Sequence, residues 1–161
     1  LWNAHVATGT PLLDYGRIAD VLAVCLSKGL GAPIGSLMVG SAEAVAEARV
    51  RRKRMGGGMR QVGVLAAAGA YALDHHVERL ADDHANARLL GEALGLDPAA
   101  VDTNIVVVER PDAMSFVERA ATAGVRIAAV GPRAVRLVTH LDVSRSDAER
   151  AAGVLSRLAA R

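Results

Sequence analysis

A glycine-rich connection between two short apolar segments is the feature of the sequence that most restricts the fold. Residues 19–26 (ADVLAVCL) and 36–39 (SLMV) have the length and the β-branched or apolar content of strands. The residues between them, SKGLGAPIG, include three glycines and one proline. Glycine admits backbone conformations closed to other residues, and proline disfavours a helix. The segment therefore predicts a tightly wound loop between two strands, the first of them buried on both faces.

The segments after the second strand have helical signals. Ser41 is a good N-cap for a helix that runs to about Arg54, where a run of three glycines stops it. The pattern of apolar residues over 59–94 predicts a second helical region, bent or broken near residue 74. Its small residues 66–70 would allow another backbone to approach closely. We therefore expect this stretch to be buried against a neighbouring element or another subunit.

The pattern changes after residue 80, where we place a domain boundary. The remaining elements are expected to be strands at 104–109, 125–129 and 134–139 and helices at 112–123 and 146–161. Ser146 to Glu149 has the spacing of a capping box at the start of the last helix. Residues 1–80 are thus interpreted as the C-terminal part of a large α/β domain and residues 81–161 as a small α+β domain. The chain starts without methionine inside a helical pattern, so we interpret it as part of a longer protein.

Composition argues against several classes of function. The net charge is only +2 and aromatic residues make up 2% of the chain, so a nucleic-acid surface is not expected. The cationic cluster at 49–54 is better explained as the C-terminal turns of a helix. The sequence shows neither an apolar segment long enough to span a membrane nor a signal peptide, so we expect no membrane partner and a cytoplasmic location. Its histidines and single cysteine do not have the spacing of zinc ligands, so we expect no metal.

Lysine is rare in this sequence. Lysine and arginine together number 19, and only Lys28 and Lys53 are lysines. A lysine forms a Schiff base only where it is held in place and partly desolvated. Lys53 lies in the cationic helix end, where arginine would serve equally well. Lys28 lies beyond the carboxyl end of the first strand among glycines, where α/β sheets bind ligands. From spacing alone, Lys28 fits an exposed turn equally well.

Three segments carry a resemblance to a known family. Residues 25–36 (CLSKGLGAPIGS) resemble the cofactor-lysine segment of the low-specificity threonine aldolases, which belong to the fold-type I pyridoxal-phosphate (PLP) enzymes. Residues 56–69 (GGGMRQVGVLAAAG) are similar to a second family segment, and residues 135–140 (VRLVTH) to a third. Their order and spacing match, and the resemblance extends over essentially the whole chain.

The resemblance implies a set of roles. Lys28 would hold PLP as an imine and act as the catalytic lysine, and Arg60 would bind the cofactor or a carboxylate across a subunit boundary in a homodimer or homotetramer. Arg136 would bind the α-carboxylate of an amino-acid substrate. From the residues alone, Arg136 is either a buried cation in need of an anion or an outward-facing strand charge. The implied reaction is cleavage of L-threonine, L-allo-threonine or a related β-hydroxy amino acid to glycine and an aldehyde.

Two alternatives stay open. Other fold-type I enzymes, namely a β-eliminating lyase, a serine hydroxymethyltransferase-like enzyme or a racemase, would share Lys28, although residues 56–63 favour the aldolase. The chain could also be a non-catalytic remnant that only associates with other subunits. In the family, the aspartate that pairs with the pyridine nitrogen and the main phosphate site come from segments before the position of Leu1. We therefore expect the 161-residue chain to be inactive by itself.

Overall fold

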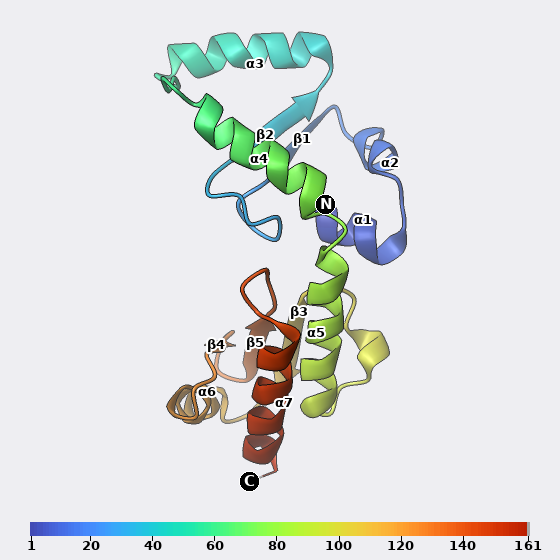
Figure 1. Cartoon of the computed structure of the whole chain (residues 1–161), viewed down its shortest axis with the longest axis vertical. Coiled ribbons are helices and arrows are strands. Elements are labelled where there is room, and N and C mark those ends of the chain that lie inside the picture. The colour runs from blue at the N-terminus through green and yellow to red at the C-terminus, as the bar shows by residue number, and fades with distance from the viewer. Residues whose placement is uncertain (161) are drawn as a thin grey trace. The chain divides into compact units, whose positions relative to one another are not determined.

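The structure of the chain is a computed structural model, and it describes residues 1–160. The chain divides into two compact units, Leu1–Glu78 (unit 1) and Arg79–Arg161 (unit 2), whose boundary lies next to the predicted boundary at residue 80. Both units contain helices and strands, so the chain is a mixed α and β protein (Figure 1). Across residues 1–160, every helix falls short of the length and apolarity that crossing a bilayer requires.

Unit 1 has a two-stranded sheet accompanied by four helices. Its elements are α1 (Trp2–Thr8), α2 (Leu12–Gly16), β1 (Val21–Cys25), β2 (Ser36–Gly40), α3 (Ala42–Arg54) and α4 (Gly63–His75). Both predicted strands are confirmed, and so is the cap of α3, where the Ser41 hydroxyl accepts a hydrogen bond of 3.1 Å from the Ala44 amide. The short helix α2 was not predicted.

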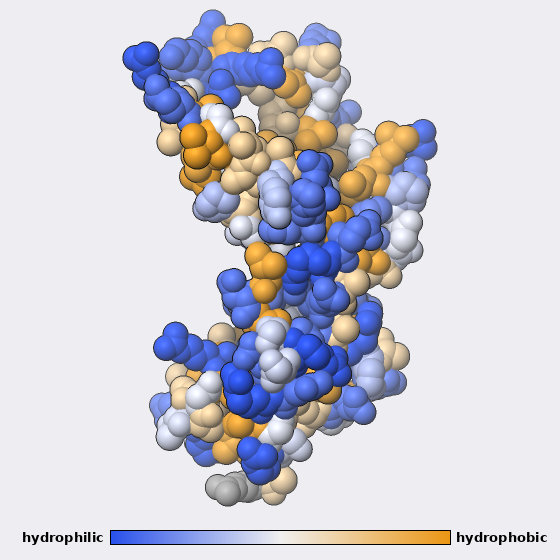
Figure 2. Space-filling view, viewed as in Figure 1, coloured by the Kyte–Doolittle hydropathy of each residue, from blue (hydrophilic) through white to orange (hydrophobic). Residues whose placement is uncertain are grey.

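The prediction that the first strand is buried on both faces is wrong for this chain. β1 pairs only with β2, antiparallel, with Cys25 opposite Ser36. Within β1 only Val24 is buried, and every residue of β2 is exposed. Two strands without a covering layer on each side cannot hide both faces. Figure 2 shows apolar side chains at the surface of unit 1, and those with large exposed areas include Val21, Ile34, Leu37, Met38, Val39, Val62, Val64 and Tyr71.

The second helical region is shorter than predicted and is interrupted. α4 begins only at Gly63, because Gln61 has a positive φ of 56° that a helix cannot contain. The interruption near residue 74 is confirmed, since α4 ends at His75 and the next helix starts at Leu80. Burial of the alanine-rich stretch is only partly observed. Gly69 and Ala72 are the buried residues of α4, and the Leu26 side chain lies so close to Gly69 that an added Cβ would be 3.0 Å from it.

Unit 2 is a three-stranded antiparallel sheet with helices packed on it. Its elements are α5 (Leu80–Ala93), the 3-10 turn η1 (Pro98–Ala100), β3 (Ile105–Glu109), α6 (Ala113–Thr122), β4 (Ala128–Ala129), β5 (Ala134–Val138) and α7 (Arg145–Ala159). The strand order is β3-β5-β4, so β5 is central. The predicted strand at 125–129 is reduced to two residues. Phe116, Val135 and Leu155 are fully buried in the core, where Val106 and Leu137 also pack.

The last helix begins with a capping box two residues earlier than predicted. Ser144, and not Ser146, is the N-cap, and its hydroxyl accepts from the Asp147 amide at 3.1 Å. The Asp147 carboxylate accepts in return from the Ser144 amide at 3.2 Å. Both serines are followed three residues later by an acidic residue, so spacing alone could not distinguish them. Ser146 instead lies inside the first turn.

A buried polar cluster links α5 to the strands of unit 2. The Asp83 carboxylate is fully buried and pairs with Arg79 one turn before it. The Thr139 hydroxyl donates to the Asp83 carbonyl at 2.6 Å, and the Asn104 amide donates to the Thr139 carbonyl at 3.0 Å. Burial raises the pKa of Asp83 above its usual value, although Arg79 opposes this. The cluster fixes the end of β5 against α5 and β3.

The lowered pKa of the neighbouring His84 predicts that the stability of the protein depends on pH. Burial, followed by repulsion from Arg88, lowers the pKa of His84 below 6.5, and Asp83 opposes this. Neutral His84 therefore contributes stability that is fully present above pH 6.5 and is lost as the pH falls through the lower pKa of the folded state. We expect the thermal unfolding temperature of the complete protein to decline on acidification below that pH, and to decline less in His84→Asn. The exposed His75→Asn variant is the control, and equal pH slopes in all three proteins would contradict the prediction.

Candidate active site

The loop after β1 presents Lys28 on a tightly closed turn. The Gly31 amide donates to the Lys28 carbonyl at 2.8 Å, and the Leu26 amide donates to the Gly35 carbonyl at 2.9 Å. Gly31 has a φ of 69°, and Gly35 has a φ of 127°. Both values lie in the region that favours glycine, which is why the sequence has glycine at these two positions. The loop predicted from sequence is therefore confirmed, and its backbone is held by its own hydrogen bonds.

A pocket of about 220 Å³ lies beside Lys28. It is lined by Leu1, Trp2, Asn3, Ala23, Val24, Cys25, Lys28 and Gly29. The indole N–H of Trp2 donates to the Cys25 carbonyl at 2.9 Å and so holds α1 against the end of β1. Lys28 itself is exposed. Sequence reasoning did not identify Trp2 or Asn3 as members of this pocket, because contact between α1 and the end of β1 is a tertiary feature.

The residues around Lys28 fit one end of PLP and not the whole molecule. A lysine among the residues that line a pocket, next to a glycine without a side chain, suits covalent attachment to an aldehyde. Lys28 has the one cationic side chain among the residues that line this pocket, and no carboxylate is among them. A cation for the phosphate and a carboxylate for the pyridine nitrogen therefore have to come from residues that do not line this pocket.

Arg60 lies outside the helix in which the sequence placed it. α4 starts at Gly63 with Val62 as its N-cap, so Arg60 belongs to the exposed turn before the helix. Arg60 is not among the residues that line the Lys28 pocket. Within residues 1–160 its guanidinium has no hydrogen bond or ion pair, and the residue is exposed.

Arg136 lies on the open face of the unit 2 sheet. In β5 it alternates with Val135 and Leu137, which are buried, while Arg136 is exposed. The structure thus answers the question that the sequence left open: the charge faces outward in this chain. Its Cα partners are Val107 on β3 and Ala128 on β4, and the Val107 side chain is 53% exposed. The two residues directly opposite Arg136 in the sheet therefore have short apolar side chains.

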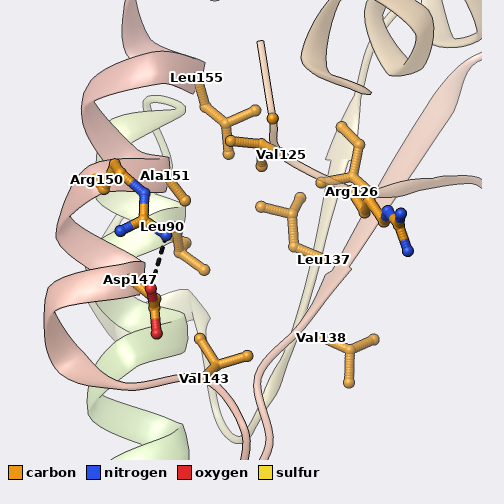
Figure 3. A pocket seen from close by; sticks show the side chains of 12 residues that line it. Leu90, Val125, Arg126, Leu137, Val138, Val143, Asp147, Arg150, Ala151 and Leu155 are labelled. Atoms are coloured by element: carbon orange, nitrogen blue, oxygen red, sulfur yellow. Dashed lines mark hydrogen bonds and ion pairs between the residues drawn. The ribbon is translucent and has the colours of Figure 1, made fainter. Parts of the chain in front are cut away.

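A second pocket, in unit 2, offers no covalent chemistry. Aliphatic side chains form its walls, with the Asp147–Arg150 ion pair of 2.7 Å on α7 at one side and Arg126 at the other (Figure 3). Neither lysine, cysteine nor serine lines it. Residues 1–160 also contain no group of three or more histidine, cysteine or acidic side chains that could hold a metal ion. Of these two pockets, only the one in unit 1 is lined by a lysine.

Comparison with known proteins places the chain in a family. The family model described as beta-eliminating lyase matches residues 1–113. A probable low-specificity L-threonine aldolase 2 of Arabidopsis thaliana is 42% identical over 160 residues, which cover 92% of this chain and 45% of that protein. The low specificity L-threonine aldolase of Escherichia coli K12 is 44% identical over 152 residues, which cover 90% of this chain and 44% of that protein. The chain belongs to the beta-eliminating lyase family, whose cofactor is PLP.

A more distant relative matches over the same extent. The probable low-specificity L-threonine aldolase of Schizosaccharomyces pombe is 34% identical over 161 residues, which cover 98% of this chain and 42% of that protein. The chain therefore spans a little under half the length of these curated relatives. The resemblance deduced from the three sequence segments is confirmed at the level of the family.

Proposed function

We propose that the complete protein containing this chain is a PLP-dependent low-specificity threonine aldolase. It would cleave the Cα–Cβ bond of L-threonine, L-allo-threonine or a related β-hydroxy amino acid to give glycine and an aldehyde. The observation that carries the proposal is the similarity to proteins of that name over at least nine tenths of the chain. Lys28, one of the residues that line a pocket, adds chemical support, because a PLP enzyme of this kind needs such a lysine.

The proposed roles follow from what each side chain can do. Lys28 Nζ attaches the cofactor covalently and gives it up to the amino group of the substrate. PLP, when bound, accepts the electrons of the bond that breaks. Arg136 binds and orients the substrate α-carboxylate through its two parallel N–H groups. Arg60 binds the cofactor phosphate or a carboxylate, reaching the site of a neighbouring subunit.

The fold proposal extends the observed units to the complete protein. Unit 1 would be the C-terminal part of a fold-type I large domain, and unit 2 the small C-terminal domain. The exposed strands β1 and β2 support the first assignment, because an uncovered apolar sheet normally has further strands or helices packed on it. The separate core of unit 2 supports the second.

The complete protein is further proposed to be a cytoplasmic homo-oligomer, either a dimer or a tetramer, whose partner is a small amino-acid substrate and not a nucleic acid or a membrane. The exposed apolar residues of α4, notably Val64 and Tyr71, supply the kind of surface that subunits cover. Cys25 is a free thiol, which suits a reducing compartment. Sedimentation of the purified complete protein would measure the number of subunits.

The activity of the isolated 161-residue chain provides the test. We expect no acetaldehyde release from threonine with added PLP above that of a Lys28→Ala control, because the Lys28 pocket contains neither a carboxylate for the pyridine nitrogen nor a second cation. The complete protein should release acetaldehyde and form glycine in equal amounts. Turnover by the isolated chain would show that the groups essential for catalysis lie within its 161 residues. A complete protein without aldolase activity would contradict the proposed function.

A further inference from the structure

One side chain ties the Lys28 loop to a helix. The Nδ1 atom of His76 lies 2.6 Å from the carbonyl oxygen of Leu30. A carbonyl can only accept, so the histidine must carry a proton on Nδ1 and donate it. Leu30 is the third residue of the turn that the Gly31 amide closes onto the Lys28 carbonyl. The hydrogen bond therefore meets the loop two residues after Lys28.

His76 is itself held firmly. It is the C-cap residue of α4, and its amide donates to the Ala72 carbonyl at 2.9 Å. Its ring stands edge-on to Tyr71, with centroids 5.5 Å apart. The other hydrogen bonds of the loop, such as Ala32 to Leu26 at 3.1 Å, join the loop to itself or to the end of β1. His76 thus connects the loop to a separate element.

The burial of Leu30 makes the hydrogen bond from His76 to its carbonyl important for the turn. Its side chain is fully buried, so the backbone around it has little access to water. A buried carbonyl without a donor is costly, and the turn would shift to find one. Because the turn is short, a shift at Leu30 would move the backbone of Lys28 as well. Covalent attachment of a cofactor depends on where the amine is held.

We propose that His76 is a positioning residue for Lys28: its Nδ1–H fixes the Leu30 carbonyl and thereby the turn from which the lysine amine meets the cofactor. The inference rests on the proposed role of Lys28 in binding PLP. His76 touches neither cofactor nor substrate in this role. Its effect should therefore fall on PLP attachment and on the mobility of the turn, and should leave the substrate KM unchanged once PLP is saturating.

The chain offers a matched control in the adjacent histidine. His75 is exposed, ends the same helix and stacks on Tyr71 with centroids 4.2 Å apart, but makes no hydrogen bond to the loop. In the complete protein, His76→Leu should weaken PLP binding about fivefold to tenfold and speed amide hydrogen exchange at Leu30 and Gly31, the scale of one lost hydrogen bond. His75→Leu should change neither. His76→Asn, whose amide nitrogen can replace Nδ1, should recover affinity to within about twofold.

Borohydride reduction and peptide mapping separate the possible failures. In the unaltered protein, a pyridoxyl adduct on the Lys28 peptide supports the proposed role of Lys28, and its absence from that peptide would overturn both that role and the inference, while lack of aldolase activity in the unaltered protein would contradict the proposed function. If the adduct is on Lys28 but His76→Leu behaves like His75→Leu, the inference alone is wrong. Should His76→Leu fail to fold, His76→Gln replaces it. The side-chain amide of glutamine reaches the position of Nε2 and not that of Nδ1, so it should not restore the hydrogen bond to the Leu30 carbonyl. Equal PLP affinities of the Gln and Asn variants would then overturn the inference.

Discussion

Replacing Lys28 with alanine in the complete protein should reduce kcat for threonine cleavage by roughly a thousandfold or more, the scale expected when a covalent catalyst loses its nucleophile. The variant should also lose covalent attachment of PLP. Lys28 is exposed at the rim of its pocket, on a turn closed by the Gly31 amide, so its removal should leave the loop folded. The measurement is acetaldehyde release, together with the mass of borohydride-reduced peptides.

Lys53 provides the control for this experiment, because it is the other lysine of the sequence. It lies in the last turn of α3, among arginines, and should tolerate alanine without loss of activity. A pyridoxyl adduct on the Lys53 peptide, or full activity of Lys28→Ala, would remove Lys28 from the proposed site.

Replacing Arg136 with alanine should have the second largest effect. A charge-assisted hydrogen bond typically contributes about 1.5–3 kcal/mol, so KM for threonine should rise about tenfold to a hundredfold. The affinity for PLP should change little, because the proposed partner of Arg136 is the substrate carboxylate. Arg136→Lys should give an intermediate KM, since lysine keeps the charge but loses the planar pair of donors.

Arg133 is the matched control for Arg136. It precedes β5 in the same unit, and it is also an exposed arginine. Arg133→Ala should leave KM unchanged, because its position is not on the open face of the central strand. A KM that is unchanged in Arg136→Ala, or that rises equally in both variants, would assign Arg136 to the solvated surface of the sheet.

Local patterns predicted the parts of the structure that local interactions determine. The cap at Ser41 and the turn with glycines 31 and 35 each depend on residues a few positions apart, and both are present. Patterns failed where two local solutions were equally good. Ser144 and Ser146 both fit a capping box, and only the geometry of the chain before α7 selects Ser144.

Burial could not be predicted from the strands alone, because it depends on what covers them. The apolar run at Val21–Cys25 indicates a core strand, yet in this chain its sheet has two strands and is largely exposed. Arg136 shows the converse case. Alternation along β5 permitted either face, and packing of Val135 and Leu137 into the core of unit 2 turned the guanidinium outward.

The sequence by itself determined the family of the chain, the glycine turn and the identity of the candidate lysine, because these depend on residue type and spacing along the chain. Only the tertiary structure showed that Trp2 and Asn3 line the pocket of Lys28 and that His76 holds the carbonyl of Leu30. His76 is 46 residues from Leu30, and no periodic pattern relates positions so far apart. The first contact arises because α1 packs against the end of β1, and the second because α4 lies near the loop, where Gly69 allows Leu26 to approach.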